Sequence, residues 1–334
     1  MVDQDRPVPG AHRARDRPRS ALAAARRSLA PRVNGAIDAH VHLWNRATDP
    51  QDWIDPLTMG AIDRDFGLAE LAGMLDATGV SRAVVVQSSN SLAETLRLLE
   101  LAAIDPRILG VVGWLDLTAD VPAQLAGIPA AHREHLVGVR HLVHIDDDEE
   151  WLGRADVNVG LDHLGEAGLA FDLVVRWWQL PLAAKTASRH PGVRFVLDHL
   201  GGVPAETGAP GEPDRVAWRD GLRALAGQPN TVAKVSGVSG LLDAGTSRDE
   251  LDRLVDIAVD AFGADRLMFG SDWPLVELAA GAAGWRQIVD RQVEGWGWAP
   301  DARQNLLEGT ALRSYRPDST LRNHHTDTTD GSLR

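Results

Sequence analysis

The 334-residue chain has no cysteine, which excludes structural disulfides, thiolate zinc sites and a cysteine nucleophile. It also has no uninterrupted run of about 18 apolar residues, the length that a transmembrane helix requires, so we expect no membrane partner. Positive charge is in deficit, with a formal net charge of −13, which argues against a general nucleic-acid binder. Lysine is nearly missing, because Lys185 and Lys234 are the only two among 34 basic residues.

The residues that are present are typical of a soluble globular protein with a sizeable core, since 44% are hydrophobic and 24% are charged. Residues 1–32 carry eight arginines against three aspartates and lack an apolar secretory segment, so we interpret them as a basic disordered leader. Residues 317–334 are polar and predict a disordered tail. These features favour one cytoplasmic enzyme domain over residues 33–316, and they leave open whether it forms a homo-oligomer.

Eight short apolar runs alternate with stretches of helical periodicity between the two tails. Such alternation predicts a parallel sheet covered by helices, and eight units favour a single (β/α)8 TIM barrel over an open sheet. No glycine-rich nucleotide-binding motif follows the first run, which weakens the nucleotide-binding α/β folds. The predicted strands are Ala36–Trp44, Arg82–Ser88, Ile108–Leu115, Leu136–His144, Ala170–Val175, Arg194–His199, Thr231–Ser236 and Arg266–Ser271, and the clearest helices are Leu92–Ile104, Leu182–Arg189, Trp218–Ala226 and Leu251–Phe262.

Polar side chains follow several of these runs, at the strand ends where barrel enzymes carry their chemistry. His40 and His42 are two residues apart on the first strand and therefore face the same way. His199 ends the sixth strand, and Asp272 follows the eighth. A single histidine at a strand end is more often a packing residue, but this group of four indicates an active site.

Other residues near the strand ends are candidates for the same site. Lys234 lies in an apolar run, where a charge needs a partner, so it is either catalytic or part of a structural ion pair. Arg140 and His141 on the fourth strand are candidates for binding substrate hydroxyls or a carboxylate. Trp44 and Trp273 are candidates for the walls of a substrate pocket, and core packing is the alternative.

Seven motifs along the chain resemble the amidohydrolase-related branch of the amidohydrolase superfamily, over residues 33–316. That branch includes sugar lactonases such as L-fuconolactonase and L-rhamnonolactonase, and 2-pyrone-4,6-dicarboxylate lactonase. The motifs are IDAHVHLW (Ile37–Trp44), VGVRH (Val137–His141), QLP (Gln179–Pro181), VLDHLG (Val196–Gly201), KVSG (Lys234–Gly237), LMFGSDWP (Leu267–Pro274) and GTALRSY (Gly309–Tyr315).

The resemblance implies a barrel hydrolase that opens a lactone ring. It also implies a divalent metal, zinc or manganese, on His40, His42 and Asp272. The predicted fifth strand lacks the histidine ligand that is usual in the wider superfamily, and the fourth has no lysine to bridge two metals, so the resemblance points to one metal at most. Catalysis without a metal stays open.

Lactone hydrolysis requires a base, stabilisation of the oxyanion and a proton for the leaving alkoxide. We interpret Asp272 as the base, with His199 and Lys234 as further catalytic groups, and expect a small lactone as the partner. One alternative is another superfamily hydrolase or a decarboxylase, although the strand-five sequence weighs against a decarboxylase. A more remote alternative is a non-catalytic barrel that binds a sugar acid.

Overall fold

The computed structural model describes residues 35–204 and 212–316. The predicted leader at 1–32 and the tail at 317–334 lie outside the described residues. Eight parallel strands form one sheet in sequence order, with each strand beside its neighbours along the chain. The strands are β1 (Ile37–Val41), β2 (Arg82–Val86), β3 (Ile108–Gly113), β4 (Leu136–His141), β5 (Ala170–Leu173), β6 (Arg194–Leu197), β7 (Thr231–Val235) and β8 (Leu267–Phe269).

The sheet closes on itself where the chain leaving β8 meets β1. Val41 forms a parallel bridge with Trp273, and the amide of His42 donates to the carbonyl oxygen of Trp273 over 2.7 Å. The amide of Asp272 in turn donates to the carbonyl of His40 over 2.9 Å. This closure confirms the predicted TIM barrel. It also places Asp272, in the segment after β8, beside His40 of β1.

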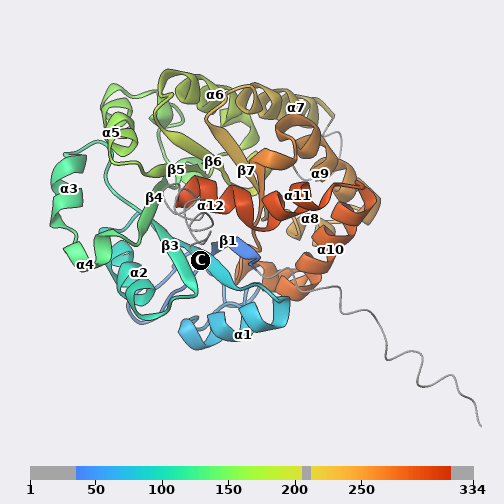
Figure 1. Ribbon diagram of the computed structural model, residues 1–334, viewed down its shortest axis with the longest axis horizontal. Coiled ribbons are helices and arrows are strands. Elements are labelled where there is room, and N and C mark those ends of the chain that lie inside the picture. The colour runs from blue at the N-terminus through green and yellow to red at the C-terminus, as the bar shows by residue number, and fades with distance from the viewer. Residues whose placement is uncertain (1–34, 205–211, 317–334) are drawn as a thin grey trace, which may run out of the picture. The chain divides into compact units, whose positions relative to one another are not determined.

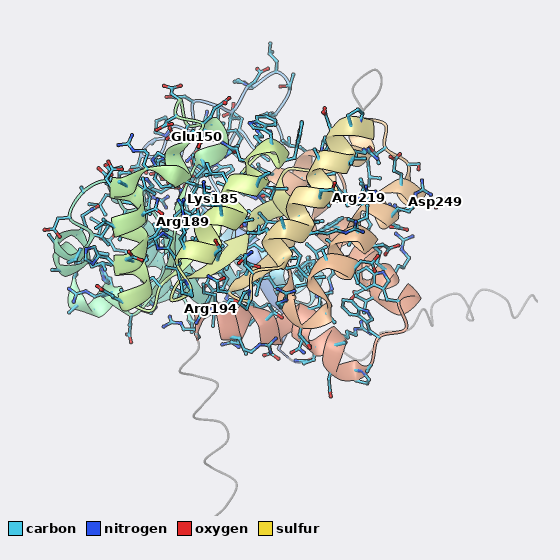
Figure 2. All side chains as sticks on the ribbon, turned by 90° about the horizontal axis from the view of Figure 1, so that it is seen from above. Glu150, Lys185, Arg189, Arg194, Arg219 and Asp249 are labelled. Carbon is cyan, nitrogen blue, oxygen red and sulfur yellow. The ribbon has the colours of Figure 1, made fainter. Side chains whose placement is uncertain are left out.

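Helices surround the strands in Figure 1, and charged side chains such as Lys185 and Arg189 point away from the barrel in Figure 2. No helix among residues 35–204 and 212–316 is long and apolar enough to cross a membrane. The helices are α1 (Leu68–Thr78), α2 (Leu92–Ile104), α3 (Val121–Gly127), α4 (Ala130–Arg133), α5 (Ala155–Glu166), α6 (Leu180–Arg189), α7 (Glu212–Ala226), α8 (Gly240–Asp243), α9 (Arg248–Phe262), α10 (Gly281–Gly295), α11 (Pro300–Gln304) and α12 (Thr310–Tyr315).

The last helix covers the end of the barrel where the strands begin. Ala311 and Tyr315 of α12 pack in one buried cluster with strand residues that include Ile37, Ala170 and Met268. Figure 1 shows α12 (red) lying over the centre of the ring of strands. Because this end is plugged, the polar residues at the opposite ends of the strands are left to form a site.

Candidate active site

Two histidines on β1 begin the site. His40 lies within the strand and His42 directly after it, so the alternation of side chains sends both rings to the same face. Their Nε2 atoms are 3.2 Å apart, and both residues are buried. The Nδ1–H of His42 donates to the carbonyl of Val86 over 2.8 Å. This bond occupies Nδ1 and directs Nε2 of His42 at the site.

Asp272 faces both rings from the segment after β8. Its Oδ1 lies 3.4 Å from Nε2 of His42 and 3.7 Å from Nε2 of His40. This oxygen is buried and has no hydrogen-bond partner. The backbone of Asp272 has a φ of 63°, a left-handed conformation that costs free energy in a non-glycine residue. The closure of the barrel against His40 therefore holds Asp272 in a strained position beside the two rings.

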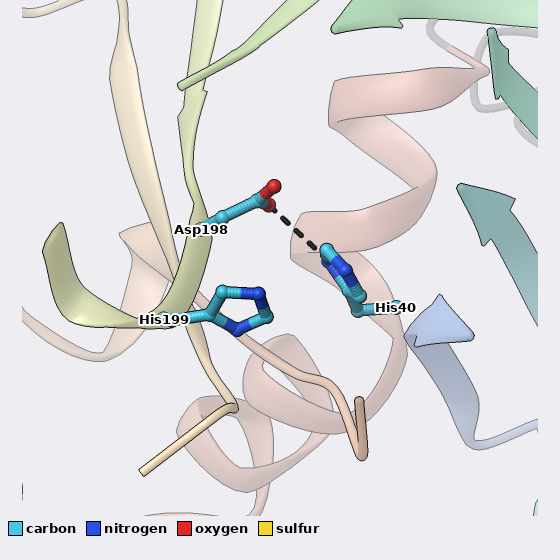
Figure 3. Close-up of side chains that lie close together, drawn as sticks. All are labelled: His40, Asp198 and His199. Carbon is cyan, nitrogen blue, oxygen red and sulfur yellow. Dashed lines mark ion pairs between the residues drawn. The ribbon is translucent and has the colours of Figure 1, made fainter. Parts of the chain in front are cut away.

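Asp198 and His199 reach the same point from the short helical turn η4 (Asp198–Gly201) after β6. Oδ1 of Asp198 lies 3.3 Å from Nδ1 of His40, as the dashed line in Figure 3 shows, and Nε2 of His199 lies 3.9 Å from Oδ1 of Asp272. Nδ1 of His199 shares a 3.0 Å hydrogen bond with Oγ of Ser236, which follows β7. Four strands thus supply one cluster.

The arrangement of His40, His42 and Asp272 fits a single divalent cation. Two ligands about 2.0–2.1 Å from a tetrahedral zinc are roughly 3.3–3.4 Å apart, which is close to the separations of 3.2, 3.4 and 3.7 Å among the three facing atoms. The free oxygen of Asp272 and the Nε2 atom of His42 are what such an ion requires. The same three residues form a set of potential metal ligands, and His40, Asp198 and His199 form a second set.

A second set of charges lies beneath the cluster. Nζ of Lys234 is 2.5 Å from Oδ2 of Asp172 and 2.9 Å from Oδ1 of Asp198, and all three side chains are fully buried. Arg140 donates to Oδ2 of Asp198 over 3.0 Å and also to the carbonyl of Gln87. These pairs fix Asp198, which in turn orients His40.

The ionisation of the site is set by burial and by neighbouring charge. Burial would raise the pKa of Asp272, but His199, His42 and His40 hold it below its ordinary range. Burial lowers the pKa of His199 and of His40, against the opposing effect of nearby aspartates. At neutral pH, Asp272 is therefore an anion that faces uncharged His40 and His199.

A cavity of about 460 Å³ opens above the cluster and gives the site room for a small molecule. His42, Arg140, His199 and Asp272 line it, so the structure brings these predicted site residues together. Among the described residues the lining is otherwise largely apolar, with the polar exceptions Ser88, His144, Arg176 and Asp198.

Five predicted site residues do not belong to the described cavity lining, and one of them, His40, lies in the cluster below the cavity. The ring of His141 stacks on Trp151 at 3.9 Å, and its Nε2 is 2.7 Å from Asp146. Trp44 and Trp273 are buried, and both pack edge-on against Phe66. Lys234 lies in the buried charge set below the cavity and does not contact its space. Substrate contact by these residues remains a prediction without geometric support.

Several residues of the site were not selected from the sequence. Asp198 stands beside His199 in the VLDHLG motif, so a charged residue at a strand end was the available signal. His144 and Arg176 line the cavity from the segments after β4 and β5. Trp53 lines it from the loop after β1, which has no periodic pattern to place the ring. Nδ1 of His144 is buried without a hydrogen-bond partner among the described residues.

Comparison with known proteins gives a consistent set of matches. Residues 37–316 match the model of a family described as amidohydrolase. The chain is 35% identical over 299 residues to an L-fucono-1,5-lactonase of Burkholderia ambifaria, with 86% of this chain and 98% of that protein covered.

Solved structures agree with this match. An amidohydrolase of Burkholderia multivorans with bound zinc is 34% identical at a TM-score of 0.77, with 84% of this chain and 98% of that chain covered. A putative 2-pyrone-4,6-dicarboxylic acid hydrolase of Pseudomonas putida is 26% identical at a TM-score of 0.64, with 84% of this chain and 97% of that chain covered. The zinc in the first structure agrees with the cation fit argued from the donor atoms.

Proposed function

The chain belongs to the amidohydrolase family and is a hydrolase, and from this membership we propose that it opens the ring of a sugar-acid lactone by attack of water on the ester carbonyl. The observation that carries the proposal is the convergence of three imidazoles on the free Oδ1 of Asp272 at the floor of the cavity. The 35% identity to a lactonase over nearly its whole length supports the choice of a lactone over another ester or an amide.

Asp272 is the proposed base. Its pKa lies below the ordinary range, so the carboxylate is ionised at neutral pH and accepts a hydrogen bond from the attacking water. A carboxylate of such low basicity removes a proton efficiently only from an acidified water. A divalent cation held by His40, His42 and Asp272 would supply that acidity and polarise the carbonyl when bound. After attack, the protonated Asp272 returns its proton to the leaving ring oxygen.

The remaining residues of the site hold the substrate and its developing charge. The ring of His199 lies beside Asp272 and lines the cavity, so we propose that it donates a hydrogen bond to the oxyanion. Arg140 contributes a fixed positive charge from the cavity floor, where Asp198 holds it. His144 and Arg176, which both line the cavity, are proposed to bind hydroxyl groups of the ring.

Replacement of Asp272 tests this proposal. We expect Asp272→Asn to lower kcat/KM for a sugar 1,5-lactone by about 10²–10⁴-fold, the usual contribution of general acid–base catalysis. Turnover is followed with a pH indicator, because each ring opening at neutral pH releases a proton. Asp249→Asn, on the exposed first turn of α9, is the matched control and should retain full activity. Near-normal turnover in Asp272→Asn would refute the assignment of the base.

The metal is tested separately, by elemental analysis and by turnover before and after chelation. One zinc or manganese per chain, with turnover lost on stripping and regained on refilling, is the expected result. A stable Asp272→Asn protein should then retain less metal than the Asp249→Asn control. Full turnover in metal-free protein would leave Asp272 as a base that acts without a cation.

A further inference from the structure

Trp53 is placed differently from the other tryptophans near the site. Its side chain lines the cavity and is 43% exposed, whereas Trp44 and Trp273 are 1% and 4% exposed. The Trp44 ring meets Trp53 at a right angle, with 5.9 Å between the ring centroids. Contact with Trp44 supports the indole from one side and leaves much of its surface open.

A chain of hydrogen bonds fixes the indole of Trp53 from the inside of the protein. Its Nε1–H donates to Oε1 of Gln51 over 2.7 Å, and Nε2–H of Gln51 donates to Oγ of Ser88, also over 2.7 Å. Ser88 donates to the carboxylate of Glu94 over 2.5 Å. Glu94 is 1% exposed and also accepts the amides of Ser88 and Ser89. The buried Glu94 thereby sets the position of a ring that is half-exposed.

Gln51, the middle residue of these contacts, has an unusual left-handed backbone conformation. Four non-glycine residues among residues 35–204 and 212–316 have positive φ, namely Gln51, His199, Leu200 and Asp272. Three of the four lie in the segments that carry His199 and Asp272. Such conformations persist where the surroundings impose them, and they gather at functional sites. Gln51, at φ 52° and 5% exposed, is held in this state by its two side-chain hydrogen bonds.

We infer that the indole face of Trp53 is the platform against which the ring of the substrate lies, and that Gln51 is the residue that positions it. This inference rests on the proposed lactone hydrolysis and deepens it, because it assigns the surface of the cavity that binds the lactone ring. The C–H face of such a ring is apolar and suits an aromatic surface, while its hydroxyls face polar groups. Arg140, His144 and Arg176 supply those polar groups in the same cavity.

Kinetics of Trp53 variants on a sugar 1,5-lactone test the platform. Loss of a contact that is equally strong in the bound substrate and the transition state raises KM and leaves kcat nearly unchanged. We expect Trp53→Ala and Trp53→Leu to raise KM about tenfold, equivalent to about 1.4 kcal/mol of binding free energy. Trp53→Phe should stay within about threefold of wild type. Trp178→Ala is the matched control, because Trp178 is 50% exposed and lies outside the described cavity lining, and its KM should not change.

Substitution of Gln51 separates positioning from folding. Gln51→Gly removes the two hydrogen bonds at a backbone conformation that glycine adopts without strain, so we expect KM to rise about threefold or more in a protein that still unfolds cooperatively. Gln51→Asn, which also tolerates this conformation but is too short to bridge both partners, should raise KM in the same way. A purely structural role for Gln51 predicts the opposite pattern, a change in Tm with no change in KM.

The outcomes distinguish this inference from the function on which it rests. Unchanged KM in both Trp53→Ala and Trp53→Leu, with wild-type turnover intact, overturns the platform and leaves lactone hydrolysis standing. An equal rise of KM in Trp178→Ala also overturns it. If the wild-type enzyme opens no sugar 1,5-lactone, the proposed function fails and the platform fails with it. If Trp53→Ala does not fold, Trp53→Leu decides.

Discussion

Lys234 lies outside the cavity and contacts the site through other charged residues. It is fully buried between Asp172 and Asp198, and its pair with Asp198 fixes the carboxylate that faces His40. Burial raises the pKa of Asp172 to about 6, whereas Lys234, His40 and Arg140 hold that of Asp198 well below its ordinary range against burial. Lys234 therefore faces at least one carboxylate that cannot be neutralised by protonation at pH 7.

We predict that Lys234→Met destabilises the protein by about 3–5 kcal/mol, because removal of one partner leaves buried charge uncompensated. The measurement is the urea midpoint at pH 7.5, with the slope of the transition checked for constancy. Lys185→Met, at the only other lysine, is exposed on α6 and should change stability by no more than about 0.5 kcal/mol. A loss below about 1 kcal/mol in Lys234→Met would contradict a structural ion pair.

The lowered pKa of His144 predicts that the free energy of unfolding decreases as the pH falls. Burial, together with Arg140 and Arg176, lowers the pKa of His144 from 6.5 to about 4. The unfolded chain therefore binds more protons than the folded protein between these values, and the His144 contribution to stability falls as pH falls from about 6.5 towards 4. We predict that His144→Gln loses about 2 kcal/mol less stability than wild type between pH 7.5 and pH 5.

Urea unfolding at the two pH values checks this prediction for His144. His163→Gln, on the outer helix α5, is the control and should lose as much stability on acidification as the wild type. An equal loss in His144→Gln and wild type would show that His144 does not carry the effect.

Single residues were predictable from the sequence where a strand end fixed their direction. His40, His42, His199 and Asp272 met in the structure because parallel strands bring their carboxyl ends to one rim. His141 was not predictable in this way, because its ring stacks on Trp151, in the irregular segment between β4 and α5, and does not line the cavity. Trp53 was missed because its position depends on the tertiary contacts of Gln51 and Ser88.

At the scale of elements, the predicted strands contain all eight observed ones, and the helix Leu92–Ile104 matches α2. Apolar periodicity located these elements because each buries a continuous face. The helix α9 begins three residues before the predicted Leu251, where the side chain of Ser247 accepts the amide of Glu250 over 3.2 Å. Capping chemistry of this kind sets the boundary, and hydrophobic spacing does not report it.

The approach of the β7 segment to η4 depends on a glycine. Gly237 has a φ of 66°, and a Cβ there would lie 2.3 Å from Nδ1 of His199. We predict that Gly237→Ala lowers kcat/KM about 10–100-fold, since a displacement of about 1 Å at a reacting group can cost this much. Gly240→Ala, where a Cβ meets no atom within 4 Å, is the control and should retain activity. Unchanged kcat/KM in Gly237→Ala would show that the position of His199 does not limit catalysis.

At the scale of the whole molecule, α12 and the buried charges connect the closed end of the barrel to the site. The hydroxyl of Tyr315 donates to Oδ2 of Asp172 over 2.8 Å, and Asp172 pairs with Lys234. Burial and the negative charge of Asp172 raise the pKa of Tyr315 well above 10, so the phenol remains a donor. The barrel could be predicted from the alternation of apolar runs and helices, but the plug formed by α12 could not, because its short sequence shows no period.

We predict that Tyr315→Phe lowers the free energy of unfolding by about 1.5–3 kcal/mol, the usual contribution of a hydrogen bond to a charged group. Chemical denaturation checks the loss, and kcat/KM measured well below the unfolding temperature should change by less than about threefold. Catalytic loss without loss of stability would instead place Tyr315 among the residues that tune the site.

The hydrogen bonds that close the barrel join the first strand to the segment after the last. His40 and Asp272 meet only across this seam, so a nascent chain on the ribosome carries both β1 histidines long before it can form the site. The moment at which turnover first appears during synthesis or refolding therefore reports when the barrel closes. In the proposed mechanism a chain stalled before Asp272 lacks its base, so turnover requires the completed fold.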